Sequence, residues 1–332
     1  MLFFVGSHAI LITLKFFKMN FTHKVLKSII AFCLIILLSG CTDNSKTTSE
    51  SEKSMVNEVT DKKWTNEQEE VIAAVEKILL AAGNSNIEVL NEMTSDNAII
   101  GYSYLKDGVW LNNEMTISEY IESIIANNNR RPFSEIPADY DIIITEDRLA
   151  LVRADAILSR FGVPLNREIN HLTLMKAGEG WKLLSIAWTV KRLREEKRTF
   201  NLELFAHSYA QAWGSKRPGF VAMFFENNGT LQVNDGEPAK GRDAISDVAK
   251  GFMTDLPDMI VRFDSLVPKS NGAEFHWTLI ATNTGPGGTG NKVKVSGFEL
   301  WKMSENGLIK ESRGYFPSEE FDRQLKFGVG IE

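Results

Sequence analysis

Two stretches from different halves of the chain share one pattern: HLTLMKAGEGWKLLS at 171–185 and GFELWKMSENGLIKES at 297–312. In each, apolar and polar side chains alternate on both sides of a short polar turn. Alternation with a period of two predicts strands that have one buried face. A turn between two such strands predicts a hairpin. We therefore expect the same antiparallel strands in both halves of the chain.

Helical patterns precede these strands in the first half. Thr65 and Gln68 have the spacing of a capping box, and the apolar residues from Val71 to Leu79 form one stripe. The elements predicted for this half are a helix over 65–82 stopped by Gly83, a short helix over 87–93, strands near 98–104, a helix over 117–126, and strands over 142–144 leading into 148–161, then 168–176 and 181–190.

The second half repeats this order. Its predicted elements are helices over 200–213 and 217–225, strands near 230–233, a helix over 242–253, and strands over 259–266, 273–284, 291–303 and 308–316. Runs of helices followed by antiparallel strands predict an α+β fold. We expect two tandem cone-shaped domains, at 64–194 and 200–332, each a curved antiparallel sheet wrapped on helices. The charged run KRLREEKRT at 191–199 separates them.

The stretch MNFTHKVLKSIIAFCLIILLSGC at 19–41 has the pattern of an export signal. Lys24 and Lys27 precede an apolar run that is short for a membrane span. Its end, Leu-Ser-Gly-Cys, resembles the bacterial lipobox, which implies that Cys41 is lipidated and becomes the mature N-terminus. Residues 1–40 are then a signal peptide, possessing a second candidate start at Met19. A plain signal anchor is the alternative.

The segment that follows Cys41 predicts a tether. Residues 42–63 contain no aromatic side chain and too little apolar surface to offset the entropy of ordering. We expect a lipid-anchored protein of the bacterial cell envelope. Thr42 stands where an aspartate favours retention in the inner membrane, so the outer membrane is favoured in an organism with two membranes.

Composition excludes several classes of function. The chain has 332 residues, 43% of them hydrophobic, and a net charge of -6 with no broad basic stretch, so we expect no nucleic-acid partner. Its two cysteines, Cys33 and Cys41, both lie near the start, which leaves the folded part without a thiolate metal site. HExxH, GxSxG and Walker-type patterns are absent from the sequence. We expect neither a metal nor a cofactor.

Residues 200–332 resemble the SnoaL-like branch of the nuclear transport factor 2-like superfamily. The resemblance lies in SYAQAW at 208–213, FHWTLIATNTGPGGTG at 275–290, VSGFELWKMSENGLIKES at 295–312 and FDRQL at 321–325. Residues 64–194 resemble a more distant member, through DRLALVRADA and HLTLMKAGEGWKLLS. The superfamily includes isomerases, cyclases, hydrolases, ligand binders and non-catalytic dimerisers. The resemblance therefore implies a fold and leaves the function open.

Glu299 is the most informative single residue. On the predicted strand it shares a face with Val293, Val295, Gly297 and Trp301, and is the one acid on that face. Desolvation raises the pKa of such a carboxyl unless it is paired. The resemblance to ketosteroid isomerases implies a donor pair formed by Glu299 and Tyr209 at a pocket floor. The alternative is a structural glutamate that pairs with Arg313 or with a tyrosine.

A catalytic base is harder to place. The isomerases carry an aspartate before the middle helix, where this chain offers Asp235 and Glu237 within NDGEPAKG. Acids in such a loop are usually turn formers. SnoaL-type cyclases use an acid on the last strand, and the nearest match here is Tyr315. Tyrosine is a poor base at neutral pH, since its reference pKa is about 10. This departure counts against cyclase chemistry.

The remaining site predictions concern pocket walls and the first half. The residues expected around the ligand are Trp213, Trp277, Asn283, Trp301, Arg313 and Tyr315. In the first half, Arg153 and Asp155 share a strand face and either pair inside a pocket or face water, with water favoured. Thr173 aligns with Glu299, so the first half is predicted to lack the pocket acid.

We therefore expect an exported lipoprotein whose second domain binds a small, mostly apolar ligand. The enzyme alternative is an isomerase-like or cyclase-like acid–base catalyst that uses Tyr209 and Glu299. The third alternative is a non-catalytic assembly module that forms a homodimer through its sheet. A pocket acid without a convincing base favours binding over catalysis.

Overall fold

The computed structural model describes residues 63–127 and 130–330. The predicted signal peptide, Cys41 and nearly all of the tether lie outside the described residues, so these stay predictions. Within the described ranges, no helix is both long enough and apolar enough to cross a membrane.

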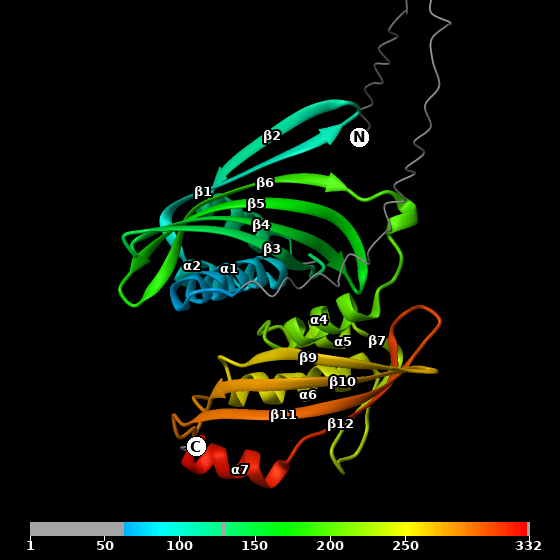
Figure 1. Ribbon diagram of the computed structural model, residues 1–332. Helices are drawn as coiled ribbons and strands as arrows, with labels where there is room; N and C mark the ends of the chain where they lie inside the picture. Colours follow the sequence, from blue (N-terminus) through cyan, green and yellow to red (C-terminus); the bar gives the residue numbers. More distant parts are fainter. Residues whose placement is uncertain (1–62, 128–129, 331–332) are drawn as a thin grey trace, which may run out of the picture. The chain divides into compact units, whose positions relative to one another are not determined.

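The first half forms three helices and six strands (Figure 1). They are α1 (Asn66–Asn84), α2 (Ile87–Met93), β1 (Thr94–Lys106), β2 (Val109–Thr116), α3 (Ile117–Ala126), β3 (Ser134–Thr145), β4 (Leu149–Arg160), β5 (Val163–Ala177) and β6 (Gly180–Arg192). A short 3-10 turn, η1 (Glu195–Lys197), lies within the predicted boundary run.

The second half has the same order of elements with one additional helix. They are α4 (Leu202–Trp213), α5 (Pro218–Ala222), β7 (Phe225–Val233), β8 (Ala239–Lys240), α6 (Gly241–Asp255), β9 (Ile260–Lys269), β10 (Gly272–Thr282), β11 (Lys292–Met303), β12 (Ile309–Tyr315) and α7 (Ser318–Phe327).

The two sheets have the same topology. Their strand orders are β2-β1-β6-β5-β4-β3 and β8-β7-β12-β11-β10-β9. One pair in each described sheet is parallel, β1 with β6 and β7 with β12, and the other pairs are antiparallel. Two mostly antiparallel sheets, each with its own helices, confirm the predicted α+β fold with two tandem domains.

Each sheet buries one face against its helices. Figure 1 shows α1 and α2 beside the first sheet, and α4 and α5 beside the second. In the first half, Val75 and Ile78 of α1 share a core with Leu172 and Leu174 of β5. In the second half, the aromatic and aliphatic side chains of α4 share a core with β10 and β11. We call the helix-facing side of each sheet its inner face.

Several details differ from the sequence predictions. The Thr65–Gln68 capping box is present, but the first helix runs through Gly83 and ends at Ser85, whose φ is 56°. Gly83 instead allows a close approach, because a Cβ there would lie 2.2 Å from the Phe133 carbonyl oxygen. Strand β3 begins at Ser134, earlier than predicted, because Pro137 and the nearby acids obscure its pattern.

Helix α7 was not predicted. Gln324 is its one buried side chain, so the sequence shows no broad apolar stripe over 318–327. The Gln324 Oε1 accepts a hydrogen bond of 2.7 Å from the backbone N–H of Lys294, which ties the helix to β11.

Candidate ligand-binding site

A cavity lies over the inner face of the second sheet, and we call it the second-domain cavity. Its volume is about 50 Å³, and it opens partly to solvent. Its walls are apolar side chains from several elements, including Trp213 of α4, Phe252 of α6, Trp277 of β10 and Phe321 of α7. Glu299 is the only ionisable residue in this lining.

The alternation of β11 places Glu299 on the inner face. Val293, Val295, Glu299 and Trp301 are buried, whereas the intervening Lys294 is exposed. Glu299 pairs across the sheet with Phe275 of β10 and with Gly314 of β12. The predicted inward orientation of this carboxyl is therefore what the strand register produces.

Three neutral donors hold the Glu299 carboxylate. The Tyr209 hydroxyl donates to Oε2 and Oε1, at 3.1 and 3.3 Å. The Trp301 indole N–H and the Ser312 hydroxyl both donate to Oε2, at 2.9 and 2.6 Å. Arg313 is not a partner: its guanidinium lies on the exposed side of β12 and pairs with Glu311 at 2.8 Å. Of the two structural alternatives, pairing with a tyrosine is the one observed.

Tyr209 lies below the cavity floor and does not line it. Its side chain is fully buried on α4, and its ring meets those of Phe224, Phe275 and Trp301 edge-on at 5.5, 5.6 and 5.2 Å. Edge-to-face pairs of this kind add packing energy beyond area burial. Tyr209 therefore supports the carboxylate from inside the core.

Burial shifts the ionisation of both partners. It raises the pKa of Glu299, and the hydrogen bonds from Ser312, Trp301 and Tyr209 oppose part of that rise. It also raises the pKa of Tyr209, with a further rise from the neighbouring Glu299 charge. Tyr209 thus remains a protonated donor at neutral pH.

Trp277 is the wall residue with an unused polar group. Gly297 is the cross-strand partner of Trp277, and a Cβ at that position would lie 2.6 Å from the Trp277 ring. A glycine is therefore needed for the indole to pack against β11 at this point. The buried Trp277 Nε1 has no hydrogen-bond partner among the described residues. Such a donor is costly unless something accepts from it.

Other predicted site residues lie elsewhere. Trp301 packs beneath Glu299, stacked on Phe275 at 4.6 Å, and does not line the cavity. Tyr315 stacks on Phe298 on the opposite face of the sheet, because strand alternation turns it outward. The predictions that Trp301, Tyr315 and Arg313 line the pocket are therefore wrong.

Asn283 and Asp235 are also outside the cavity lining. The Asn283 side-chain amide donates to the Leu325 carbonyl and the Thr289 hydroxyl, both at 3.1 Å, and so fixes the loop between β10 and β11 against α7. Asp235 is exposed in the turn after β7, as expected of a turn former. Neither position supplies a base to the cavity.

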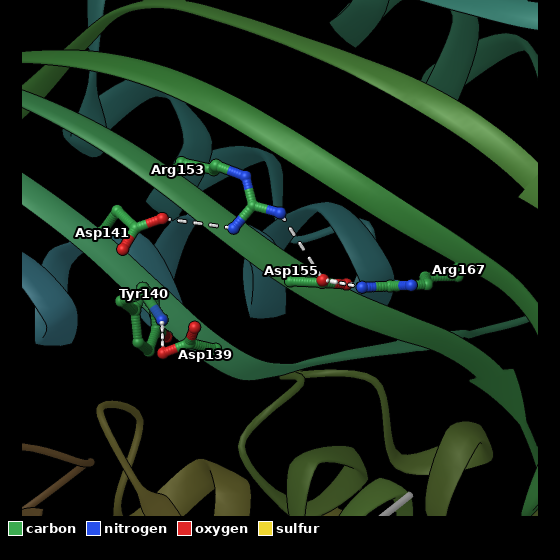
Figure 2. A network of polar contacts seen from close by, with 6 residues as sticks. All are labelled: Asp139, Tyr140, Asp141, Arg153, Asp155 and Arg167. Carbon is green, nitrogen blue, oxygen red and sulfur yellow. Dashed lines mark hydrogen bonds and ion pairs between the residues drawn. The ribbon is translucent and has the colours of Figure 1, made fainter. Parts of the chain in front are cut away.

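Figure 2 shows the surroundings of Arg153 and Asp155. Arg153 forms ion pairs with Asp141 of β3 at 3.3 Å and with Asp155 at 3.7 Å. Arg167 of β5 also pairs with Asp155. These residues alternate with the buried Ala154, so they lie on the face of the sheet opposite the helices. They pair with each other on that outer face and do not line the cavity on the inner face.

The first half has no acid at the position of Glu299, as predicted, but it has two buried acids at other positions. Glu135 and Glu168 are 9% and 4% exposed on the inner face of the first sheet. Thr173 lies on the outer face, between the buried Leu172 and Leu174. The ungapped alignment placed it opposite Glu299 because the turn after β11 is longer than the turn after β5. Counting from the starts of β4 and β10, Leu172 pairs with Val152 as Glu299 pairs with Phe275. An alignment that allows for the different turn lengths places Leu172, and not Thr173, opposite Glu299.

Comparison with known proteins gives a family match within the second domain. Residues 206–312 match the family model of the SnoaL-like domain. A protein of ketosteroid isomerase-like fold from Catenulispora acidiphila is 16% identical (36% of this chain and 89% of that chain; TM-score 0.33). An NTF2-like protein from Cytophaga hutchinsonii is 18% identical (38% of this chain and 99% of that chain; TM-score 0.29). Another from Burkholderia pseudomallei is 15% identical (36% of this chain and 92% of that chain; TM-score 0.32). No curated protein matches the chain. Residues 206–312 of this chain form a SnoaL-like domain.

Proposed function

We propose that the second domain binds a small, mostly apolar ligand in the second-domain cavity. The observation that carries this proposal is the lining itself, whose side chains are apolar apart from a single ionisable group. Cavities of this kind, with few polar groups, are the usual form of small-molecule sites.

The hydrogen bonds at Glu299 favour binding over acid–base catalysis. The Tyr209 hydroxyl, which an isomerase would direct at a substrate oxyanion, already donates to Glu299. Glu299 in turn accepts from Trp301 and Ser312. No second titratable side chain lines the cavity in the described part of the chain. A proton-transfer mechanism needs a positioned acid and base near the substrate.

Trp277 suggests one polar feature of the ligand. Its unpartnered Nε1 is a buried donor in a residue of the cavity wall. A ligand with one acceptor, such as a carbonyl oxygen, would satisfy it. We therefore expect an apolar molecule that carries a hydrogen-bond acceptor.

A matched pair of probes tests this proposal: acetophenone, which has a carbonyl, and ethylbenzene, which has none. The full chain should bind both and should bind acetophenone at least fivefold more tightly, as measured by competition in ligand-observed NMR. Trp277→Phe should remove that preference. Trp181→Phe, the same change at a buried indole outside this cavity, is the control. Failure to bind either probe would contradict the proposal.

We further propose that the chain is exported and anchored to the cell envelope through Cys41. This rests on the basic and apolar run at 19–40 and the lipobox-like Leu-Ser-Gly-Cys that ends it. Cys41→Ser should abolish incorporation of a labelled fatty acid and leave the precursor uncleaved. Labelling that survives the change would contradict the anchor.

A further inference from the structure

A second cavity lies over the inner face of the first sheet, and we call it the first-domain cavity. Its volume is about 280 Å³, and it opens partly to solvent. Aliphatic side chains from α1 and α2 form one part of its lining, while β3, β5 and β6 form another. Unlike the second-domain cavity, it has two acids in its lining, Glu135 and Glu168.

Strand register brings these acids into one site. Glu168 and Asn170 are two residues apart on β5, so both face inward. Glu135 on β3 faces the same side, two strands away across β4. The Asn170 amide donates to the Glu135 Oε1 at 2.5 Å, and the Asn166 amide donates to the Glu168 Oε1 at 3.0 Å.

The negative charge of this site has no counter-ion in the described part of the chain. Neither Glu135 nor Glu168 forms an ion pair there, and the Oε2 atom of each accepts no hydrogen bond. Arg130 also lines the cavity, but its guanidinium donates to the Tyr120 hydroxyl at 3.1 Å and lies over the Tyr120 and Phe133 rings. Each carboxylate therefore has one amide donor and no positive charge to offset its burial, which is unfavourable for the ionised form.

Protonation relieves part of this cost in the empty site. Burial raises the pKa of Glu135 to about 7, and the nearby Glu168 charge contributes to the rise. Burial also raises the pKa of Glu168. A cation that entered the cavity would favour the ionised form of both groups.

The walls beside the acids are aromatic. Tyr102 of β1 stacks on Trp188 of β6 with a centroid distance of 5.2 Å, and both line the cavity. Tyr120 and Phe133 line it as well. Aromatic faces attract organic cations, and the attraction strengthens when the cation is desolvated. The donor set is poor for Ca²⁺, which takes six to eight oxygen ligands.

We infer that the first-domain cavity binds a small organic ammonium ligand, whose charged nitrogen is held by Glu135 and Glu168 and whose apolar body lies against the aromatic wall. The two oxygens without partners supply the acceptors for N–H groups. The free volume and the apolar lining accommodate a ring or a short alkyl chain. This site is separate from the one proposed in the second domain.

The test uses 2-phenylethylamine, which is a cation at neutral pH, and 2-phenylethanol, its uncharged counterpart. Isothermal titration of the full chain at pH 7.5 should give an amine affinity at least tenfold above that of the alcohol. Glu168→Gln should lower the amine affinity at least tenfold and leave the alcohol unchanged. Equal affinity for the two probes, or absence of amine binding, would overturn the inference.

Two controls separate loss of the site from loss of the fold. Glu299→Gln removes a buried carboxylate from the other domain and should leave amine binding unchanged. Glu135→Asp keeps the charge and should retain more amine affinity than Glu135→Gln. If both Glu135→Gln and Glu168→Gln bind the amine as tightly as the wild type does, the inference is also overturned, whatever the melting temperatures of the variants.

Discussion

The two domains place a buried glutamate on the inner face of the same kind of sheet, but they treat its charge differently. In the second domain, Tyr209, Trp301 and Ser312 all donate to Glu299. In the first, Glu168 accepts one hydrogen bond, from Asn166. The same burial therefore gives a carboxylate with three donors in one domain and a carboxylate with one donor in the other. The count of donors, rather than the presence of an acid, separates the two cavities.

The difference follows from where each acid lies along its strand. Leu174 pairs with Ala150 as Trp301 pairs with Ala273. By the same count, Leu172 is the counterpart of Glu299. Glu168 comes four residues before Leu172, so it lies at the position of Val295. At that position Glu168 lines the first-domain cavity and has Asn166 as its hydrogen-bond donor. A conserved topology thus permits two chemistries.

Replacing each acid with leucine should separate the domains most strongly. Glu299→Leu leaves three buried donors without an acceptor, at about 1–3 kcal/mol each, so we expect the second domain to lose about 3 kcal/mol or more. Glu168→Leu removes a poorly compensated buried charge and should be neutral or stabilising for the first domain. Hydrogen exchange read by mass spectrometry reports on each domain separately. Equal losses in both domains would contradict the comparison.

The pH dependence of stability should sharpen the same contrast. Burial raises the pKa of Glu135 in the folded protein to about 7, above the ordinary range of a glutamate. A raised folded pKa means that the stability present below the unfolded pKa is lost as the pH rises through the folded pKa. The first domain should therefore lose on the order of 3 kcal/mol between pH 5 and pH 8, counted at about 1.36 kcal/mol per unit.

Glu135→Gln is the variant that checks this loss. Its first domain should keep most of its stability over the same pH range, since the titrating group is gone. Urea unfolding at pH 5 and at pH 8 measures the difference. A wild-type profile that matches the variant would mean that Glu135 titrates normally.

The outer-face charges should matter least. Arg153 and Arg167 are 35% and 49% exposed, so solvent and salt screen their pairing with Asp155. We expect Asp155→Asn to cost less than about 1 kcal/mol and the cost to shrink in high salt. Thermal unfolding at two salt concentrations is the measurement. A loss as large as that of Glu299→Leu would show that this network is structural.

Strand alternation was sufficient to predict the repeated α+β plan and the inward position of Glu299. It failed for residues whose orientation depends on turns. Thr173 was assigned the place of Glu299 because the alignment ignored the longer turn after Met303. Glu135 was missed because Pro137 hides the start of β3. Asn283 was wrongly placed in the pocket because loop hydrogen bonds leave no sequence pattern.

Carboxyl chemical shifts of ¹³C-labelled glutamate test the difference between the two cavities most directly. At pH 7, adding 2-phenylethylamine to the full chain should move the resonances of Glu135 and Glu168 toward the ionised carboxylate and leave that of Glu299 in place. Assignment follows from the Glu135→Gln, Glu168→Gln and Glu299→Gln variants. A shift at Glu299, or no shift at Glu135 and Glu168, would contradict the distinction between a carboxylate with three donors and carboxylates with one donor.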